Sequence, residues 1–194
     1  MTRSLMAAAL FLLAPALASA QAPAAERPSA DAYTHEVQRG IEQLAGGDTA
    51  GATSTFRQAL AREARRPEAP FYLATVLRMT GDLDGAVRGF TQSAALAQAA
   101  SLPRWQARAL HGVASTLERI AGRIEEARAA WQAYSSFADA NPTVSDAQLG
   151  RARVQAIDLM NEQEQAYVQV RRRIAEREEE RRREAEQPRQ RRRR

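Results

Sequence analysis

One short pattern of residues occurs three times in this chain of 194 residues. Each time, a turn glycine is followed five residues later by an alanine and nine residues later by an aromatic side chain. The three sets are Gly47, Ala52 and Phe56, then Gly81, Ala86 and Phe90, and finally Gly122, Ala127 and Trp131. The first two sets lie 34 residues apart, and the last two lie 41 apart. A repeat of this length is typical of stacked helix pairs, because one pair cannot bury its apolar face alone.

The residues on either side of each turn have the apolar spacing of helices. Tyr33, Val37, Ile41 and Leu44, for example, follow one another at steps of four and three, which places them on one helical face. The sequence therefore predicts three helix pairs within residues 31–142, at about 33–66, 67–102 and 103–142. We expect the seven extra residues of the second interval to lengthen both helices around Pro103.

The repeated positions resemble the tetratricopeptide repeat (TPR) family. The resemblance rests on the glycine turn with Asp48 or Asp82 after it, on the alanine and aromatic positions, and on the small residues Gly40 and Ala74 before the turn. The third unit departs from the pattern at Tyr134, where the other two have a small residue. The resemblance implies an all-α, TPR-like α-solenoid in which three helix hairpins form a right-handed stack.

The resemblance also implies a binding groove, since in this family the first helix of each pair lines a concave surface. The implied groove positions are Thr34, Val37, Ile41, Leu44, Glu68, Phe71, Thr75, Arg78, Met79, Val113, Thr116 and Arg119. Such a groove would hold a peptide or helix of another protein by apolar contact, with an arginine or two for an acidic group. The alternative for any one of these side chains is that it only faces solvent. Members that clamp a C-terminal carboxylate use Lys and Asn, but this chain has no Lys and its Asn residues lie elsewhere.

Apolar spacing continues after the repeats and predicts a capping helix over residues 143–174. Thr143 and Asp146 have the spacing of a capping box at its start. After Ile174 no large apolar residue remains, so residues 175–194 are expected to be a charged Arg/Glu-rich tail, partly disordered from Pro188 onward.

The basic charge of the chain is concentrated at its C-terminal end. Residues 171–194 contain 12 Arg and 6 Glu, a net charge of +6, whereas residues 21–170 contain 15 Arg and 17 acidic residues, a net charge of −2. An anionic membrane surface is one candidate partner for this tail. The arginines concerned are Arg181, Arg182, Arg183, Arg189, Arg191, Arg192, Arg193 and Arg194. The alternatives are a solvated end without a role and nucleic-acid binding; export and the lack of aromatic residues for base stacking argue against the last.

The first twenty residues have the pattern of a secretory signal peptide. Arg3 gives a basic start, an apolar run extends from Leu5 to Leu17, and the small residues Ala18 and Ala20 precede a cleavage site before Gln21. An uncleaved membrane anchor is the alternative, but the run is short for ~30 Å of hydrocarbon. We expect a periplasmic or secreted protein that begins with a flexible lead over residues 21–30.

The residues that enzymes use are sparse in this sequence. The chain has no Cys, and its histidines, His35 and His111, lie far apart in the sequence, so a polar residue on a partly exposed helix face is the simpler interpretation of each. No nucleophile elbow, phosphate-binding loop or zinc-protease motif is present. We therefore expect no enzyme activity, no cofactor and no metal. The favoured function is a periplasmic or secreted adaptor or scaffold, and the alternative is an envelope protein that binds anionic surfaces through its tail.

Overall fold

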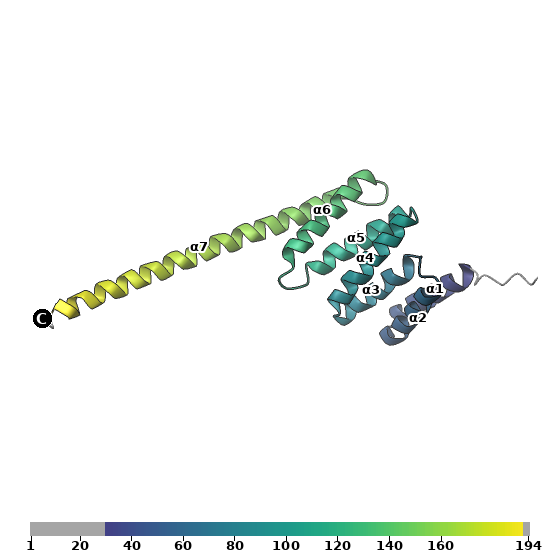
Figure 1. Cartoon of the computed structure of the whole chain (residues 1–194), viewed down its shortest axis with the longest axis horizontal. Helices are drawn as coiled ribbons and strands as arrows, with labels where there is room; N and C mark the ends of the chain where they lie inside the picture. Colours follow the sequence, from purple (N-terminus) through teal and green to yellow (C-terminus); the bar gives the residue numbers. More distant parts are fainter. Residues whose placement is uncertain (1–29, 192–194) are drawn as a thin grey trace, which may run out of the picture.

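The computed structural model describes residues 30–191, and these residues form an all-helical chain. Three antiparallel helix hairpins stack side by side, and a long final helix leaves the stack (Figure 1). The elements are α1 (Ala30–Ala45), α2 (Thr49–Arg62), α3 (Glu68–Thr80), α4 (Leu83–Ala99), α5 (Pro103–Leu117), α6 (Ile124–Ala140) and α7 (Ala147–Arg191). The predicted fold class is confirmed. Residues 1–29, which hold the expected signal peptide and nearly all of the flexible lead, lie outside the described residues.

The three turn glycines have the same backbone conformation. Gly47, Gly81 and Gly122 have φ values of 84°, 93° and 80°, in the left-handed region that glycine adopts at little cost. In the first two hairpins an aspartate then caps the next helix, as the Asp48 carboxylate accepts a hydrogen bond from the Gly51 amide. Arg123 replaces this aspartate in the third hairpin. Its guanidinium instead pairs with Glu126 and, at 2.7 Å, with Asp84 of the preceding hairpin.

The repeated aromatic residues form the centre of the core. Phe56, Phe90 and Trp131 are each at most 2% exposed. Small residues let the helices approach these rings, and the alanines of the repeated motif are completely buried. The three aromatic residues of the repeat are therefore core residues.

The seven extra residues of the longer repeat are divided between helices and a turn. As expected, α4 is three residues longer than α2, and α5 is two residues longer than α3. The connection between α4 and α5 is two residues shorter than the one between α2 and α3, so these elements account for three of the seven. The remaining four lie in the segment from Glu118 to Arg123, because α5 ends at Leu117 rather than reaching the Gly122 turn. There the amides of Arg119 and Ile120 bond to carbonyls only three residues back, which tightens and ends the helix.

The first helix of each hairpin lies on the inner side of the stack. α1 contacts α3 and α3 contacts α5, whereas among residues 30–191 the second helices α2, α4 and α6 do not contact one another. The first helices α1, α3 and α5 therefore lie closer to one another than the second helices do. This side is the one on which the resemblance places a groove.

α7 differs from the predicted capping helix and tail. It begins at Ala147, where the Asp146 carboxylate accepts a hydrogen bond from the Gln148 amide, so the predicted capping box at Thr143 is wrong. Its first turns pack on α6, with Ile157 only 2% exposed. It then continues past residue 174 to Arg191, as one helix of 45 residues.

The expected disorder after Pro188 is therefore not seen within the described residues. Ion pairs one helical turn apart support the projecting part of α7, namely Arg172–Glu176 at 2.9 Å and Arg183–Glu179 at 2.6 Å. No helix in the described part of the chain has the length and apolar content needed to cross a membrane.

Replacing Gly112 of α5 with alanine tests the close approach of α5 to Phe90. A Cβ atom there would lie 2.7–2.9 Å from three atoms of the buried Phe90 ring. Overpacking of this kind costs about 1–3 kcal/mol, more than the gain of up to about 1 kcal/mol in helix propensity. We expect Gly112→Ala to lower the free energy of unfolding, measured by urea denaturation.

Gly46→Ala is the control, because a Cβ at Gly46 comes no closer than 3.4 Å to a neighbouring atom. An unchanged or higher stability of Gly112→Ala would contradict the packing described here.

Candidate functional site

The inner faces of α3 and α5 meet in a strip of aromatic and basic side chains. The ring centroids of Phe71 and Trp105 lie 5.4 Å apart, and the guanidinium of Arg108 lies over both rings, at 4.8 and 4.7 Å. Two turns further along, Arg78 donates a hydrogen bond to the Ser115 hydroxyl at 3.3 Å. Arg108 lies 37 positions after Phe71, and Ser115 likewise lies 37 positions after Arg78.

Arg78 is the most unusual charge in this strip. Its side chain is half-buried and forms no ion pair with a carboxylate among the described residues. Instead, Arg119 donates a hydrogen bond to the Arg78 carbonyl at 3.5 Å. Burial, followed by the positive charge of Arg119, lowers the pKa of the Arg78 guanidinium. Buried charges are normally paired, so an anionic group placed here would relieve an unfavourable arrangement.

A small hollow opens beside this strip, between the inner helices and the α6–α7 connection. Its volume is about 240 Å³, and it is lined by Phe71, Ala107, Arg108, His111, Tyr134 and Val144. The His111 ring makes edge contacts with Trp131 and Tyr134, with centroids 5.3 and 5.9 Å apart. The hollow is thus apolar at its base, with Arg108 at its rim.

In α1 and α3 the structure brings together some of the predicted groove residues. Phe71, Thr75 and Arg78 share the inner face of α3, and Met79 is 61% exposed at its end. Glu68 is half-buried and already pairs with Arg66 at 3.0 Å. In α1, Thr34 is exposed, while Ile41 and Leu44 pack against the buried core around Phe56. Val37 is only 7% exposed, so its assignment to an open groove is wrong.

In the third unit, two of the three assigned groove positions are wrong. Thr116 is fully buried and donates a hydrogen bond to the Gly112 carbonyl. Val113 packs between the core around Phe90 and the core around Trp131. The glycine turns of the second and third units lie 41 residues apart, but four of the added residues lie in the turn after α5. The register between α3 and α5 is therefore 37 residues instead of 41. Arg119, the third assigned residue, is exposed beside Arg78 in the turn after α5.

Several side chains of this strip, and of the hollow beside it, are not among the groove positions that the resemblance implies. On α5 these are Arg108, His111 and Ser115, which share one face of the helix at steps of three and four residues. That spacing is visible in the sequence and could have identified this face. The neighbouring Tyr134 and Val144 come from other elements, and no local pattern relates them to α5.

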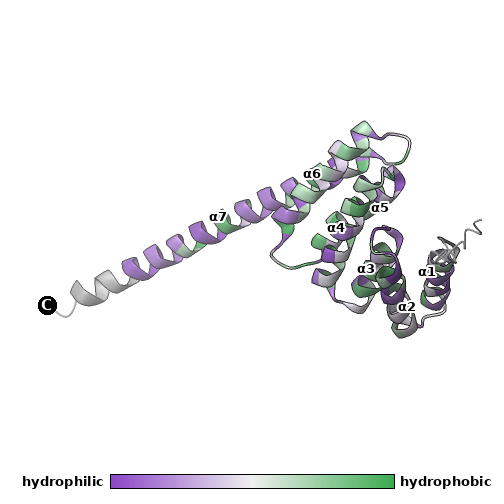
Figure 2. Ribbon diagram, turned by 45° about the vertical axis from the view of Figure 1, so that its right-hand side comes forward, coloured by the Kyte–Doolittle hydropathy of each residue, from purple (hydrophilic) through white to green (hydrophobic). Residues whose placement is uncertain are grey.

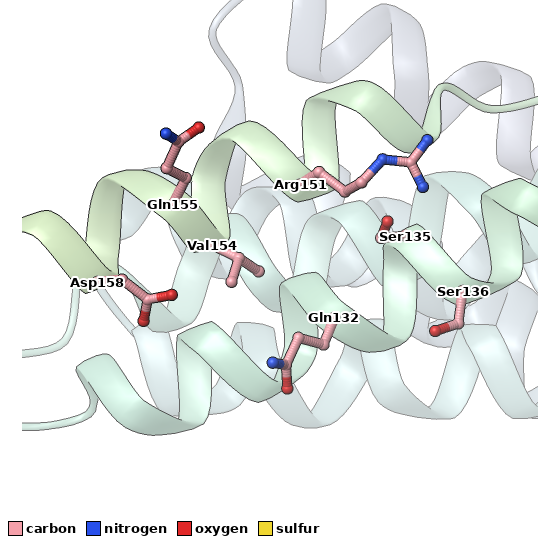
Figure 3. Close-up of a pocket in the computed structure, with 7 residues that line it drawn as sticks. All are labelled: Gln132, Ser135, Ser136, Arg151, Val154, Gln155 and Asp158. Atoms are coloured by element: carbon pink, nitrogen blue, oxygen red, sulfur yellow. The ribbon is translucent and has the colours of Figure 1, made fainter.

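A second, larger hollow lies between α6 and α7, with a volume of about 610 Å³. Figure 3 shows its lining side chains spread along the two helices, with Arg151 and Asp158 at opposite ends. Both charges are already paired: Arg151 with Asp139 at 2.9 Å, and Asp158 with Arg128 at 2.6 Å. This hollow therefore lacks the uncompensated charge that distinguishes the strip on α3 and α5.

The tail arginines are only partly described. Arg181, Arg182 and Arg183 are exposed on α7, and Arg183 pairs with Glu179. Arg189 and Arg191 lie in the helix, without described side chains, and Arg192, Arg193 and Arg194 lie outside the described residues. Residues 171–184 hold seven Arg and five Glu, so the described part of the tail carries little net charge. No group of three or more possible metal ligands occurs in the described part of the chain.

Comparison with known proteins identifies the fold. No protein-family model matches the sequence, and no curated protein matches it. Among solved structures, the type III secretion translocator chaperone SycD of Yersinia enterocolitica is similar, with a TM-score of 0.59 and 16% sequence identity. The match covers 69% of this chain and 88% of SycD. At this identity the likeness shows the fold, which is TPR-like, and nothing more.

Partial burial of His111 predicts a pH-dependent stability. Burial, together with the charge of Arg78, lowers the pKa of His111 below its usual 6.5, and Glu118 only partly opposes this. The unfolded chain therefore takes up the proton at a higher pH than the folded chain, so the free energy of unfolding falls as the pH drops below about 6.5.

We expect His111→Gln to weaken this fall, measured by urea denaturation between pH 7 and pH 5. His35→Gln, which alters an exposed ring, is the control. Equal pH dependence in all three proteins would contradict the placement of His111.

Proposed function

We propose that this protein is an adaptor that holds a segment of another protein in the groove formed by α3 and α5. The segment would be extended or helical, with an acidic group that reaches Arg78 and Arg119. The single observation that carries the proposal is the half-buried Arg78, which lies beside a second arginine and has no carboxylate partner among the described residues. A charge-assisted hydrogen bond from a bound carboxylate would compensate it.

The aromatic part of the groove supports the same proposal. Phe71, Trp105 and the aliphatic part of Arg108 give a peptide an apolar surface next to the basic one. Aromatic and arginine side chains of this kind are enriched where proteins bind one another. SycD, which shares the fold, is described as a chaperone of a secretion translocator.

We further propose where the protein acts and to which class of protein it belongs. It acts outside the cytoplasm, in the periplasm or after secretion, because residues 1–20 have the pattern of a signal peptide. It is a binding protein and not an enzyme, because the sequence lacks the known catalytic motifs and the groove presents arginines and aromatic rings. The partner is then a protein of the cell envelope or the exterior.

Photocrosslinking in the producing cells tests this proposal. A photoreactive amino acid at Met79, which is exposed at the end of α3, should form an adduct of defined mass with one protein. The same amino acid at Gln92, exposed on α4, should not form that adduct. Mass spectrometry of the Met79 adduct would identify the partner, and deletion of residues 176–194 should leave the adduct in place.

Charge reversal provides the second arm of this test. Arg78→Glu with Arg119→Glu should remove most of the adduct, because the groove would then repel an acidic segment. Arg57→Glu with Arg88→Glu makes the same change of charge at exposed positions of α2 and α4 and should have no effect. Arg119→Glu alone, at an exposed position, should weaken the adduct without a risk to folding. Retention of the adduct in the groove variants, or its loss in the controls, would contradict the proposal.

A further inference from the structure

The projecting part of α7 exposes apolar side chains that nothing in the described chain covers. The hydrogen bond from the Asn161 amide to Glu125, at 2.7 Å, joins α7 to the body just before this part begins. Every side chain from 162 to 184 is exposed, including Tyr167 at 58% and Ile174 at 51%. Figure 2 shows this part of α7 as largely hydrophilic, with hydrophobic residues interspersed along it. A single helix gains little from exposed residues of this kind unless another surface covers them.

Most of these apolar residues lie on one narrow stripe, which we call the α7 stripe. Its members follow one another at alternating steps of four and three residues and are Ala156, Met160, Gln163, Tyr167, Val170 and Ile174. This is the a/d spacing of a coiled coil. At 3.6 residues per turn, the centre of the stripe lies about 100° around the helix from Ile157, which faces the body. The stripe is therefore free to meet another helix.

The charges beside the α7 stripe are separated along the helix. Residues 159–170 contain two charged residues, Glu162 and Glu164, whereas residues 171–177 contain four Arg and one Glu. Two such helices placed in parallel would bring the arginine-rich parts together. Placed antiparallel, the acidic part of each would lie against the basic part of the other.

We propose that the α7 stripe pairs with the same stripe of a second copy of this chain, as an antiparallel two-helix coiled coil. In this arrangement Tyr167 packs on Val170 of the second copy at the centre, and Ile174 packs on Gln163 of the second copy. Glu164 lies on the flank of the stripe and meets Arg171 of the second copy. Each of these contacts occurs twice by the two-fold symmetry.

A hollow at the base of the projecting helix fits this arrangement. Its volume is about 660 Å³, and it lies between the Gly122 turn and α7, with Ile120, Ile124, Met160 and Tyr167 among its apolar lining residues. Glu164 adds an acidic group to its lining, whereas Glu118 already pairs with Arg153. In the antiparallel pairing the residue opposite Met160 is Arg177 of the second copy. The hollow would thus receive the aliphatic stem and the charge of an arginine.

The oligomeric mass of the protein tests this proposal. The protein, purified from cells that express the whole chain, should show a concentration-dependent dimer by light scattering and analytical ultracentrifugation. Val170→Asp should abolish the dimer because it places a charge in the centre of the stripe. Val168→Asp should leave it intact, because Val168 is exposed to a similar extent on the same helix but lies off the stripe. A wild-type chain that stays monomeric, or equal effects of the two variants, would overturn the proposal.

The absence of cysteine allows the orientation to be tested by disulfide crosslinking. Gln163→Cys mixed with Ile174→Cys should form a crosslinked heterodimer under mild oxidation, whereas Gln163→Cys alone should not. Efficient self-crosslinking of Gln163→Cys would show a parallel pair and overturn the antiparallel arrangement. As a second check, Glu164→Arg should weaken the dimer at least several-fold, and Arg171→Glu added to it should restore the dimer. Failure of that restoration would also contradict the proposed pairing.

Discussion

The packing of the Phe90 ring determines how the helix pairs of this protein join. The ring belongs to α4, but it contacts Phe71 of α3 edge-on, with centroids 5.3 Å apart, and it lies directly against Gly112 of α5. One side chain thus connects the second hairpin to the first helix of the third. Because the ring is almost completely buried, any shift of α5 along α4 would leave a cavity or produce a clash. The relative position of α3 and α5 follows from this contact.

The position of α5 relative to α3 determines which side chains meet in the proposed groove. With α5 placed by Phe90, Arg108 lies over Phe71, and Ser115 receives the hydrogen bond from Arg78. Arg119 then comes close to Arg78, which concentrates positive charge on an otherwise aromatic inner face. The groove that we propose for an acidic protein segment is therefore a consequence of core packing. The long α7 starts from the same stack but points away from it (Figure 1). Its exposed stripe can therefore pair with a second copy of the chain without covering the proposed groove.

Much of the fold was predictable from the sequence, for physical reasons that can be named. The turn glycines adopt a conformation that other residues rarely accept, and the buried aromatic residues recur at a fixed distance from them, so both leave a periodic signal. The groove on α5 was less predictable because its register depends on where the extra residues of the third unit are placed. Nothing local to the sequence shows that four of them lie after Leu117. The continuation of α7 past residue 174 was also missed, since no large apolar residue follows Ile174 and the helix there carries ion pairs such as Arg183–Glu179 instead.

The register between α3 and α5 can be measured directly in solution by nuclear Overhauser contacts between assigned side chains. We predict contacts from the Phe71 ring to Arg108, and from Arg78 to Ser115, which both correspond to the register of 37 residues. Contacts from Phe71 to Gly112 in place of Arg108 would correspond to a register of 41 residues. That result would contradict both the placement of α5 and the basic groove that depends on it.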